Sequence, residues 1–256
     1  MIFRRTVANL RAQNWMAIGI ELAIVVVGVF IGLQVSNWNQ ARIEQRATQR
    51  MIEELKPGLA NFIDFFETAK TYYSTTGRYA DTAFAGWRND PNVTDEQFVI
   101  GAYQASQIYT FGINAVNWTQ VFGGDQLGNI SDPQLRRGLA NLMTLNFDMI
   151  DTPAIDTPYR QNVRQVIPEG IQDEIREHCG DRADTAKPLT QVLPAACDLD
   201  LPQEQWAEAA AALRARPDLT AGLRWHRAAA AAFLSNMELF EFQTRQVFDR
   251  IEATTR

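Results

Sequence analysis

The sequence predicts an all-α protein: one N-terminal transmembrane helix that continues into a stalk, followed by a helical bundle with long antiparallel helices. Three observations predict this class. Residues 15–35 form an almost unbroken apolar run, apolar residues then recur every three or four positions from Ile43 to Tyr73, and the same spacing returns between residues 218 and 253. Such spacing puts apolar side chains on one face of a helix, and no segment shows the alternation typical of strands.

The apolar run has the length of a membrane-spanning helix. At about 1.5 Å per residue, a helix of roughly 20 residues matches the hydrocarbon core of a bilayer. Only Glu21 and Gln34 are strongly polar within the run. Trp15 and Trp38 stand at its two ends, where indole rings favour the level of the lipid headgroups. We therefore expect a transmembrane helix over residues 15–36, with the two tryptophans as interface anchors.

The N-terminus has the features of an uncleaved signal anchor. Its apolar stretch is longer than that of a signal peptide, and residues 36–42 offer no small-x-small cleavage motif. Arginines flank both ends of the apolar run, so charge counting leaves the orientation nearly balanced. The short basic tail is hard to translocate, and Cys179 and Cys197 can form a disulfide outside the cytoplasm. Both points favour a cytoplasmic tail and an exported domain.

Glu21, Gly28 and Gly32 fall on one face of the predicted membrane helix, within about 20° of each other. Small residues four apart let two membrane helices approach closely, and an intramembrane glutamate is costly enough to indicate a site. One interpretation is a packing seam for a homo-oligomer or a partner membrane helix, with Glu21 protonated or paired inside it. The other is that Glu21 reaches headgroups or water near Trp15 and that the glycines have no special role.

Residues 18–40 read IGIELAIVVVGVFIGLQVSNWNQ, which places a glycine, a glutamate, an apolar run, a Leu-Gln pair and Asn-Trp-Asn in this order. This segment resembles the opening of an uncharacterised family of bacterial single-pass membrane-anchored proteins. The matching positions are Gly19, Glu21, Gly28, Leu33, Gln34, Asn37, Trp38 and Asn39, and one departure is Ile20 between the glycine and the glutamate.

A weaker resemblance to the same family covers residues 109–145, and residues 150–256 show none. Its matching positions are Gly124, Leu127, Ile130, Leu135 and Arg136. The resemblance implies a bacterial, mostly helical, membrane-anchored protein and implies no activity. Together with the expected orientation it predicts a single-pass protein of the bacterial inner membrane with its domain in the periplasm.

The domain organisation follows from these patterns. We expect a cytoplasmic tail (1–14), the transmembrane helix (15–36), a stalk and the first part of the helical domain (37–150), an irregular proline-rich excursion with one short helix near 169–178 (151–202), and C-terminal helices that close the bundle (203–256). In the first part of the domain we predict a kink at Pro57–Gly58, a loop at 86–93 and a capping box at Thr94–Gln97 that opens a helix to about Tyr109. A short helix at 114–122, a turn at Gly123–Asp125 and a helix start at Ser131–Gln134 are expected to follow. Near the C-terminus we predict an alanine-rich helix at 206–215 and a final helix at 218–253.

Charge is distributed unevenly along the chain, whose net charge is −6. Residues 1–50 hold six arginines against Glu21 and Glu44, whereas residues 51–256 hold 18 Lys and Arg against 28 Asp and Glu. The acidic domain argues against a nucleic-acid partner, because phosphate binding needs clustered cations. The basic region around the apolar run suits the headgroups of a lipid bilayer.

The sequence predicts no catalytic, cofactor-binding or metal-binding residues. It contains neither a G-x-S-x-G nor a Walker A motif, and GGDQLGN at 123–129 lacks the lysine and hydroxyl residue of a phosphate loop. The only histidines, His178 and His226, form no tight ligand pair with each other or with the cysteines. Cys179 and Cys197 form either a disulfide, which stabilises by roughly 3 kcal/mol for such a loop, or two unpaired thiols.

Aromatic residues gather in the first half of the exported domain, and they form either the bundle core or a pocket for a small apolar or cationic ligand. They are Tyr72, Tyr73, Tyr79, Trp87, Tyr103, Tyr109, Phe111 and Trp118. We predict a non-enzymatic interaction or structural protein that is membrane-anchored and self-associates. The alternative is an extracytoplasmic ligand-sensing domain, which would act through a partner because the N-terminal tail leaves no room for an output domain.

Overall fold

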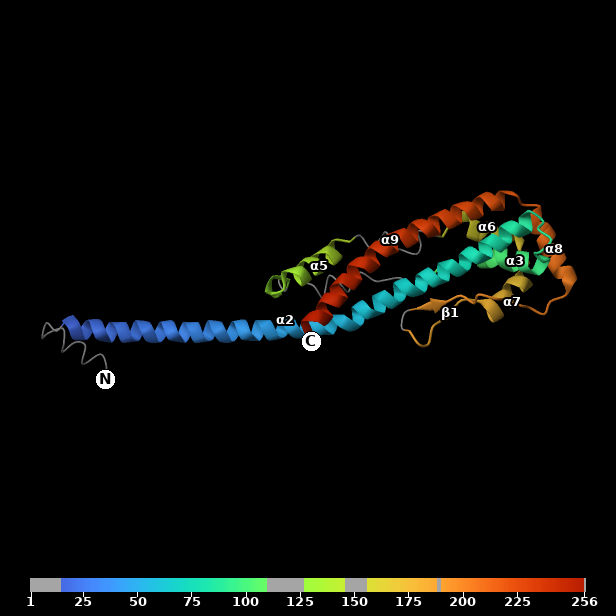
Figure 1. Cartoon of the computed structure of the whole chain (residues 1–256). Coiled ribbons are helices and arrows are strands. Elements are labelled where there is room, and N and C mark those ends of the chain that lie inside the picture. Colours follow the sequence, from blue (N-terminus) through green and yellow to red (C-terminus); the bar gives the residue numbers. More distant parts are fainter. Residues whose placement is uncertain (1–14, 110–126, 146–155, 188–189, 256) are drawn as a thin grey trace. The chain divides into compact units, whose positions relative to one another are not determined.

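The computed structural model describes residues 15–109, 127–145, 156–187 and 190–255 (Figure 1). Nearly all regular structure in these residues is helical, which confirms the all-α class. The predicted tail at 1–14, the helix at 114–122 and the turn at Gly123–Asp125 lie outside the described residues.

The chain divides into two compact units, Met1–Glu53 and Glu54–Arg256, and the second is called the helical body here. Helix α2 runs from Trp15 to Trp87 and contributes residues to both units. It is the one helix among the described residues that is long and apolar enough to cross a membrane, and it lies near the N-terminus. Residues 15–38 of α2 are called the anchor segment.

Helix α2 is continuous through Pro57, so the proline does not end it. Proline has no backbone N–H and therefore cannot donate to the carbonyl of Glu53 one turn earlier. The apolar stripe continues through this point: Leu55 before the proline is buried, and so are Leu59 and Phe66 after it. The burial of that stripe compensates for the missing hydrogen bond.

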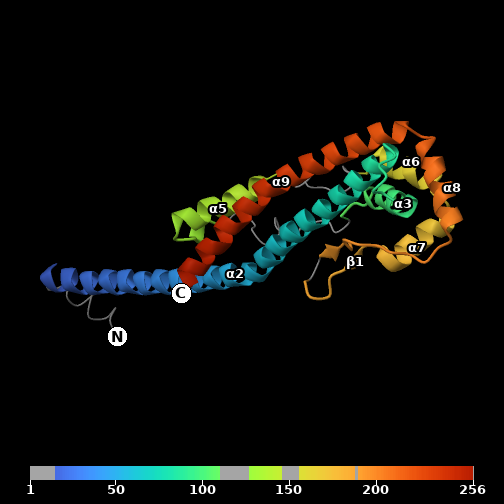
Figure 2. The ribbon, with the colours of Figure 1, turned by 45° about the vertical axis from the view of Figure 1, so that its right-hand side comes forward.

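Helix α9, Asp218–Thr255, packs antiparallel to the part of α2 that lies in the helical body, and the two run side by side in both views (Figures 1 and 2). The ion pairs between them show that they run in opposite directions, because the residue number of the α9 partner falls as that of the α2 partner rises. The pairs are Lys56–Glu252, Glu67–Arg245, Lys70–Glu241 and Asp81–Arg227. The predicted antiparallel pairing of an early and a late long helix is therefore confirmed.

The core between these two helices is mainly aromatic. Tyr73 meets Phe233 edge to face with ring centroids 5.7 Å apart, and Phe66, Met237 and Phe240 are buried in the same cluster. Edge-to-face contacts suit the charge distribution of aromatic rings and add to the burial of apolar surface.

The end of α2 is a Schellman motif. The amide of Asp90 donates to the carbonyl of Ala85, and the amide of Asn89 donates to that of Gly86. Asn89 takes a left-handed backbone with φ 56°, which asparagine tolerates better than most residues. Gly86 is needed for a different reason, since a Cβ there would lie 2.1 Å from the ring of Phe98.

A second core forms around helix α3, Asp95–Gln104, which packs against α6, Pro158–Val166, and α8, Gln203–Arg214. The capping box of Thr94 and Gln97 is present as predicted. All seven residues from Phe98 to Gln104 are buried, so α3 is surrounded by protein on every side. Helix α7, Glu169–Cys179, contributes Ile171 and Ile175 to this core.

Helix α5, Pro133–Thr144, begins where the sequence predicts, with Asp132 as its N-cap and Pro133 in the first turn. It packs on α9 through Leu135, Leu139 and Leu142, all buried, and the short 3-10 turn η1, Leu127–Asn129, precedes it. Residues 146–155, which follow in the chain, lie outside the described part of it.

Two predictions about the helical body are wrong. Helix α3 ends at Gln104, five residues before Tyr109, because residues 105–109 turn away and bury polar side chains instead. The segment 151–202 is also less irregular than predicted, since it contains α6 as well as the expected α7. Pro158 and Pro168 open these helices rather than break them, as proline does at a first turn.

The same segment contains the only strands of the described residues. Strands β1, Arg182–Ala183, and β2, Gln191–Val192, form a two-residue antiparallel pair in which Arg182 lies opposite Val192. Helix α8 then starts after Pro202, and α9 follows after Pro217, as predicted.

Candidate functional site

The predicted packing face of the anchor segment is open. A Cβ built on Gly28 or Gly32 meets no atom within 4 Å, and the large apolar side chains around them are exposed. Trp15 and Trp38 are exposed at the two ends, and the guanidinium of Arg42 lies 5.6 Å from the indole of Trp38 one turn earlier. The whole circumference of this stretch thus offers an apolar surface to its surroundings.

Cys179 and Cys197 are joined by a disulfide, with their Cα atoms 5.5 Å apart. The bond ties the end of α7 to the segment that leads into α8. Cys179 is buried in the core around α3, and its carbonyl accepts a hydrogen bond of 2.7 Å from the side chain of Gln104. Since both thiols are used, neither is available to a metal, and the described residues hold no group of three or more potential ligands.

A chain of side-chain amides leads from the disulfide to a cluster of arginines. Gln104 accepts from the amide of Gln107 at 3.2 Å, and the Gln107 oxygen accepts from Arg160 at 3.1 Å and from Arg164 at 3.0 Å. The guanidinium of Arg164 also lies 4.8 Å from the ring centre of Tyr103. Neutral acceptors and a ring face thus hold two cations close together.

Arg164 is the least compensated cation of this cluster. Its Nε is buried and has no hydrogen-bond partner among the described residues. Burial and then the nearby charge of Arg160 lower the pKa of Arg164. Arg160 lies near the carboxylate of Asp156 at 4.0 Å, and Arg176 pairs with Asp173. The cluster therefore places three arginines close together, with the carboxylates of Asp156, Asp173 and Asp181 near them.

Most of the described aromatic candidates belong to the core, and Tyr79 and Trp87 are partly buried against it. Tyr72, Tyr73, Tyr103 and Tyr109 are buried, whereas Phe111 and Trp118 lie outside the described residues. The rings of Tyr72 and Tyr109 meet edge to face at 5.3 Å.

Each buried phenol of this core has a polar partner. Tyr72 donates to the carbonyl of Ile108 at 3.1 Å, Tyr73 accepts from the amide of Tyr109 at 3.1 Å, and Tyr109 accepts from the amide of Gln191 at 3.2 Å. Burial raises the pKa of Tyr109 to about 12, and it raises the pKa values of Tyr72 and Tyr73 further. These phenols are neutral and structural, and they connect the segment after α3 to α2 and β2.

The two histidines have unrelated surroundings. His178 is exposed and lies 3.3 Å from Glu174 on the same helix. His226 is buried on α9, where its Nδ1 lies 2.8 Å from the hydroxyl of Thr157 and its ring is near that of Tyr159. Burial, together with the charge of Arg160, lowers the pKa of His226 to about 4, so the ring is neutral at pH 7.

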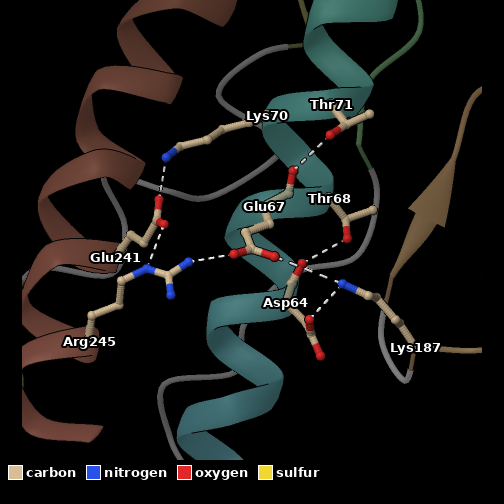
Figure 3. Close-up of polar contacts among 8 residues, drawn as sticks. All are labelled: Asp64, Glu67, Thr68, Lys70, Thr71, Lys187, Glu241 and Arg245. Carbon is tan, nitrogen blue, oxygen red and sulfur yellow. Dashed lines mark hydrogen bonds and ion pairs between the residues drawn. The ribbon is translucent and has the colours of Figure 1, made fainter. Parts of the chain in front are cut away.

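A group of charges, called the ion clamp, joins α2, α9 and the loop between the strands (Figure 3). Glu241 of α9 accepts from Lys70 of α2 and from Arg245 one turn later on α9. Burial alone would raise the pKa of Glu241, but the hydrogen bonds from the two cations outweigh it and lower that pKa. Arg245 also bonds Glu67 at 2.6 Å, and Lys187 of the loop bonds Asp64 at 2.7 Å.

Neither the ion clamp nor the arginine cluster is predicted from the sequence. The charges of the clamp do occur at three-four spacing, as in Asp64, Glu67 and Lys70, and Arg160 and Arg164 are four apart. This spacing shows which side chains share a helix face, but it does not show which other helix they meet. Because α6 itself was not predicted, there was no reason to place its two arginines on the same face of a helix.

The fold and these contacts define the class: a helical protein with a helix near its N-terminus that is apolar enough to cross a membrane, and with a disulfide-tied helical body. Comparison with protein-family models, with curated proteins and with solved structures finds no match for the chain.

Proposed function

We propose that this protein is a membrane-anchored, non-enzymatic interaction protein of the bacterial envelope that self-associates through its membrane helix. The observation that carries the proposal is the anchor segment, which is apolar on all sides and exposes its large side chains. In water such a surface is costly, whereas in lipid it is compatible with its surroundings. Glu21, Gly28 and Gly32 provide a face on which a second helix can pack closely.

The same proposal places the protein in the inner membrane with a cytoplasmic N-terminus and a periplasmic body. The disulfide between Cys179 and Cys197 supports this orientation, because such bonds form and persist in oxidising compartments. The bacterial origin and membership of the uncharacterised single-pass family rest on residues 18–40. A fusion of alkaline phosphatase to the C-terminus tests the orientation: the fusion is active if the body is exported, and an inactive fusion contradicts the proposal.

Self-association is tested by enlarging the glycines of the packing face. Gly28→Leu and Gly32→Leu place bulky side chains where two helices would meet, so the oligomer should dissociate at least tenfold more readily in detergent. Gly19→Leu is the matched control, because Gly19 lies nine residues before Gly28 and hence on the opposite face, also with no atom within 4 Å of its Cβ position. Mass measurement of the extracted protein reads the outcome; a monomer, or an oligomer insensitive to all three changes, contradicts the seam.

A ligand-sensing role through a partner protein is the second candidate, and the arginine cluster favours it. The unpartnered Nε of Arg164 and the proximity of Arg160 would suit a small anion such as a carboxylate. In that case small carboxylates raise the Tm of the full-length protein, and Arg164→Met removes the increase. Equal Tm values with and without these anions contradict the sensing role and leave the anchor proposal intact.

A further inference from the structure

Helix α9 carries a second apolar face, here called the outer stripe, in addition to the one it buries against α2. Its members are Trp225, Ala228, Ala232, Ser235, Leu239 and Phe242, and all are exposed. Trp225, Leu239 and Phe242 are 66%, 50% and 56% exposed. The steps between members alternate between three and four, which is the heptad spacing of a helix-packing seam.

The outer stripe lies on nearly the opposite side of α9 from the core. Phe233, Met237 and Phe240 point into the body and are at most 4% exposed. A helix that only covers a core needs a single apolar stripe, with polar residues on its other side. The described residues cover the inner side of α9 with α2, α5 and α6 and leave the outer stripe exposed, which indicates a further packing partner.

Several charged side chains of this part of α9 pair with α2, whereas Arg224 and Glu238 are exposed beside the outer stripe. Arg227 pairs with Asp81, and Arg245 pairs with Glu67, both on α2. Glu241 is likewise held by Lys70. The six members of the outer stripe are uncharged, and the exposed charges at its border, Arg224 and Glu238, are of opposite sign.

We infer that the outer stripe is where the bodies of two copies of this chain pack, α9 against α9. This inference rests on the proposed self-association and adds a second contact to it. A two-fold interface must be self-complementary, and the stripe has small residues in its middle and large ones at both ends. Under a two-fold axis parallel to α9, each residue of the stripe faces its counterpart in the second copy, so that the small residues meet in the middle of the seam and the large ones at its ends.

The size of the outer stripe fits a contact that works together with the membrane helix. Two stripes can remove roughly 1,000 Å² from water, which is near the lower limit for a specific interface. Such a contact is weak between free molecules. Anchoring both copies in one membrane raises their effective concentration into the range where a weak contact is occupied.

The test uses full-length protein in lipid vesicles and a bis-maleimide of short span. Ser235 is near the middle of the stripe and hence near the two-fold axis in either helix direction, and its replacement adds the only free thiol. Ser235→Cys should yield a crosslinked dimer, whereas Glu208→Cys, at an exposed site on α8, should not.

Adding Leu239→Glu and Phe242→Glu to the Ser235→Cys protein should reduce the crosslink at least tenfold, because it buries carboxylates at the seam. Ala207→Glu on α8 is the control for an added charge at an exposed helical site, and it should leave the crosslink unchanged. Since the replaced residues are exposed, the Tm of the body should not fall. A crosslink that persists with both glutamates present overturns the inference.

The two proposals fail separately. An oligomer that is sensitive to Gly28→Leu but gives no Ser235→Cys crosslink overturns the outer-stripe contact alone. A protein that is monomeric after extraction in detergent and gives no crosslink in vesicles overturns the outer-stripe contact and the proposed self-association together.

Discussion

Helix α2 has two regions that differ in whether their apolar side chains are covered by the rest of the chain. In the anchor segment Val27 and Phe30 are 54% and 60% exposed, and apolar residues occupy every side of the helix. In the helical body Leu59, Phe66 and Ala69 are at most 1% exposed, and charges such as Glu67 and Lys70 occupy the remaining faces. One region needs an apolar solvent, whereas the other carries its own partner, α9, within the chain.

The anchor segment and the helical body also differ in the contacts that stabilise them. The helical body is held by aromatic packing, a disulfide and the ion clamp, all between segments distant in sequence. The contacts of the anchor segment that the structure describes are local, such as Arg42 on Trp38 and, just beyond it, Gln40 on Glu44. Changes in the body should therefore alter its unfolding, and changes in the anchor segment should alter its membrane behaviour instead.

The largest expected effect comes from a matched pair on α2. Phe66→Ala removes a ring that is 1% exposed and should lower the free energy of unfolding of the body by about 3–5 kcal/mol. Phe30→Ala, which alters an exposed ring of the anchor segment, should change it by less than about 0.5 kcal/mol. Urea denaturation of the full-length protein in detergent measures both. Equal losses would mean that the two regions are not distinct.

Removing the disulfide should have the next largest effect. Cys179→Ala with Cys197→Ala should lower the free energy of unfolding by about 3 kcal/mol, because the bond restricts the unfolded chain. Reductant added to the unmodified protein should have the same effect, whereas the helicity of the anchor segment should not respond. Unchanged stability under reductant would show that the bond is absent or contributes nothing.

Acidification should weaken the body through His226. Its pKa is about 4 in the folded state and near 6.5 when unfolded, so only the unfolded chain takes up the proton between these values. Stability is then complete above about pH 6.5 and falls as the pH approaches 4, by up to about 3 kcal/mol. His226→Gln should flatten this dependence in urea titrations from pH 7 to 4. An equally steep dependence in the variant would assign the loss to other groups.

The smallest effect is expected in the ion clamp. Lys70→Met removes one of the two cations that bond Glu241, and it should cost about 1 kcal/mol, less at high salt. Arg46→Met is the control, since Arg46 is exposed on the other unit and should leave the unfolding of the body unchanged. A salt-independent loss in Lys70→Met would point to the packing of the lysine stem rather than to its charge.

Much of the helical body could be predicted from spacing and capping residues. The Thr94–Gln97 box, the Asp132–Pro133 start and the two C-terminal helices all appear where the sequence places them, since caps depend on atoms within a few residues. Helix α6, in contrast, could not be predicted from spacing and capping residues. The prolines of 151–202 predict an irregular segment, yet Pro158 begins α6, because proline breaks the interior of a helix but fits its first turn.

The candidate sites divide in the same way. The face of Glu21, Gly28 and Gly32 follows from helix geometry alone, and Cys179 and Cys197 were the only candidates for a disulfide. The arginine cluster could not be predicted, because Gln107 and Arg164 come from segments more than 50 residues apart. The neutral state of His226 depends on its burial by other elements, and this burial cannot be predicted from the residues next to it in the sequence.

By itself, the sequence determined the all-α class, the long apolar helix near the N-terminus and the starts of most helices, because backbone hydrogen bonds and caps within a helix are local. Only the tertiary structure decided which faces meet. It pairs α2 with α9, surrounds α3 on every side, brings Arg160 and Arg164 to Gln107, and leaves the outer stripe of α9 exposed. These outcomes depend on packing between distant segments, in which many side chains must fit together at once, and no local pattern encodes that fit.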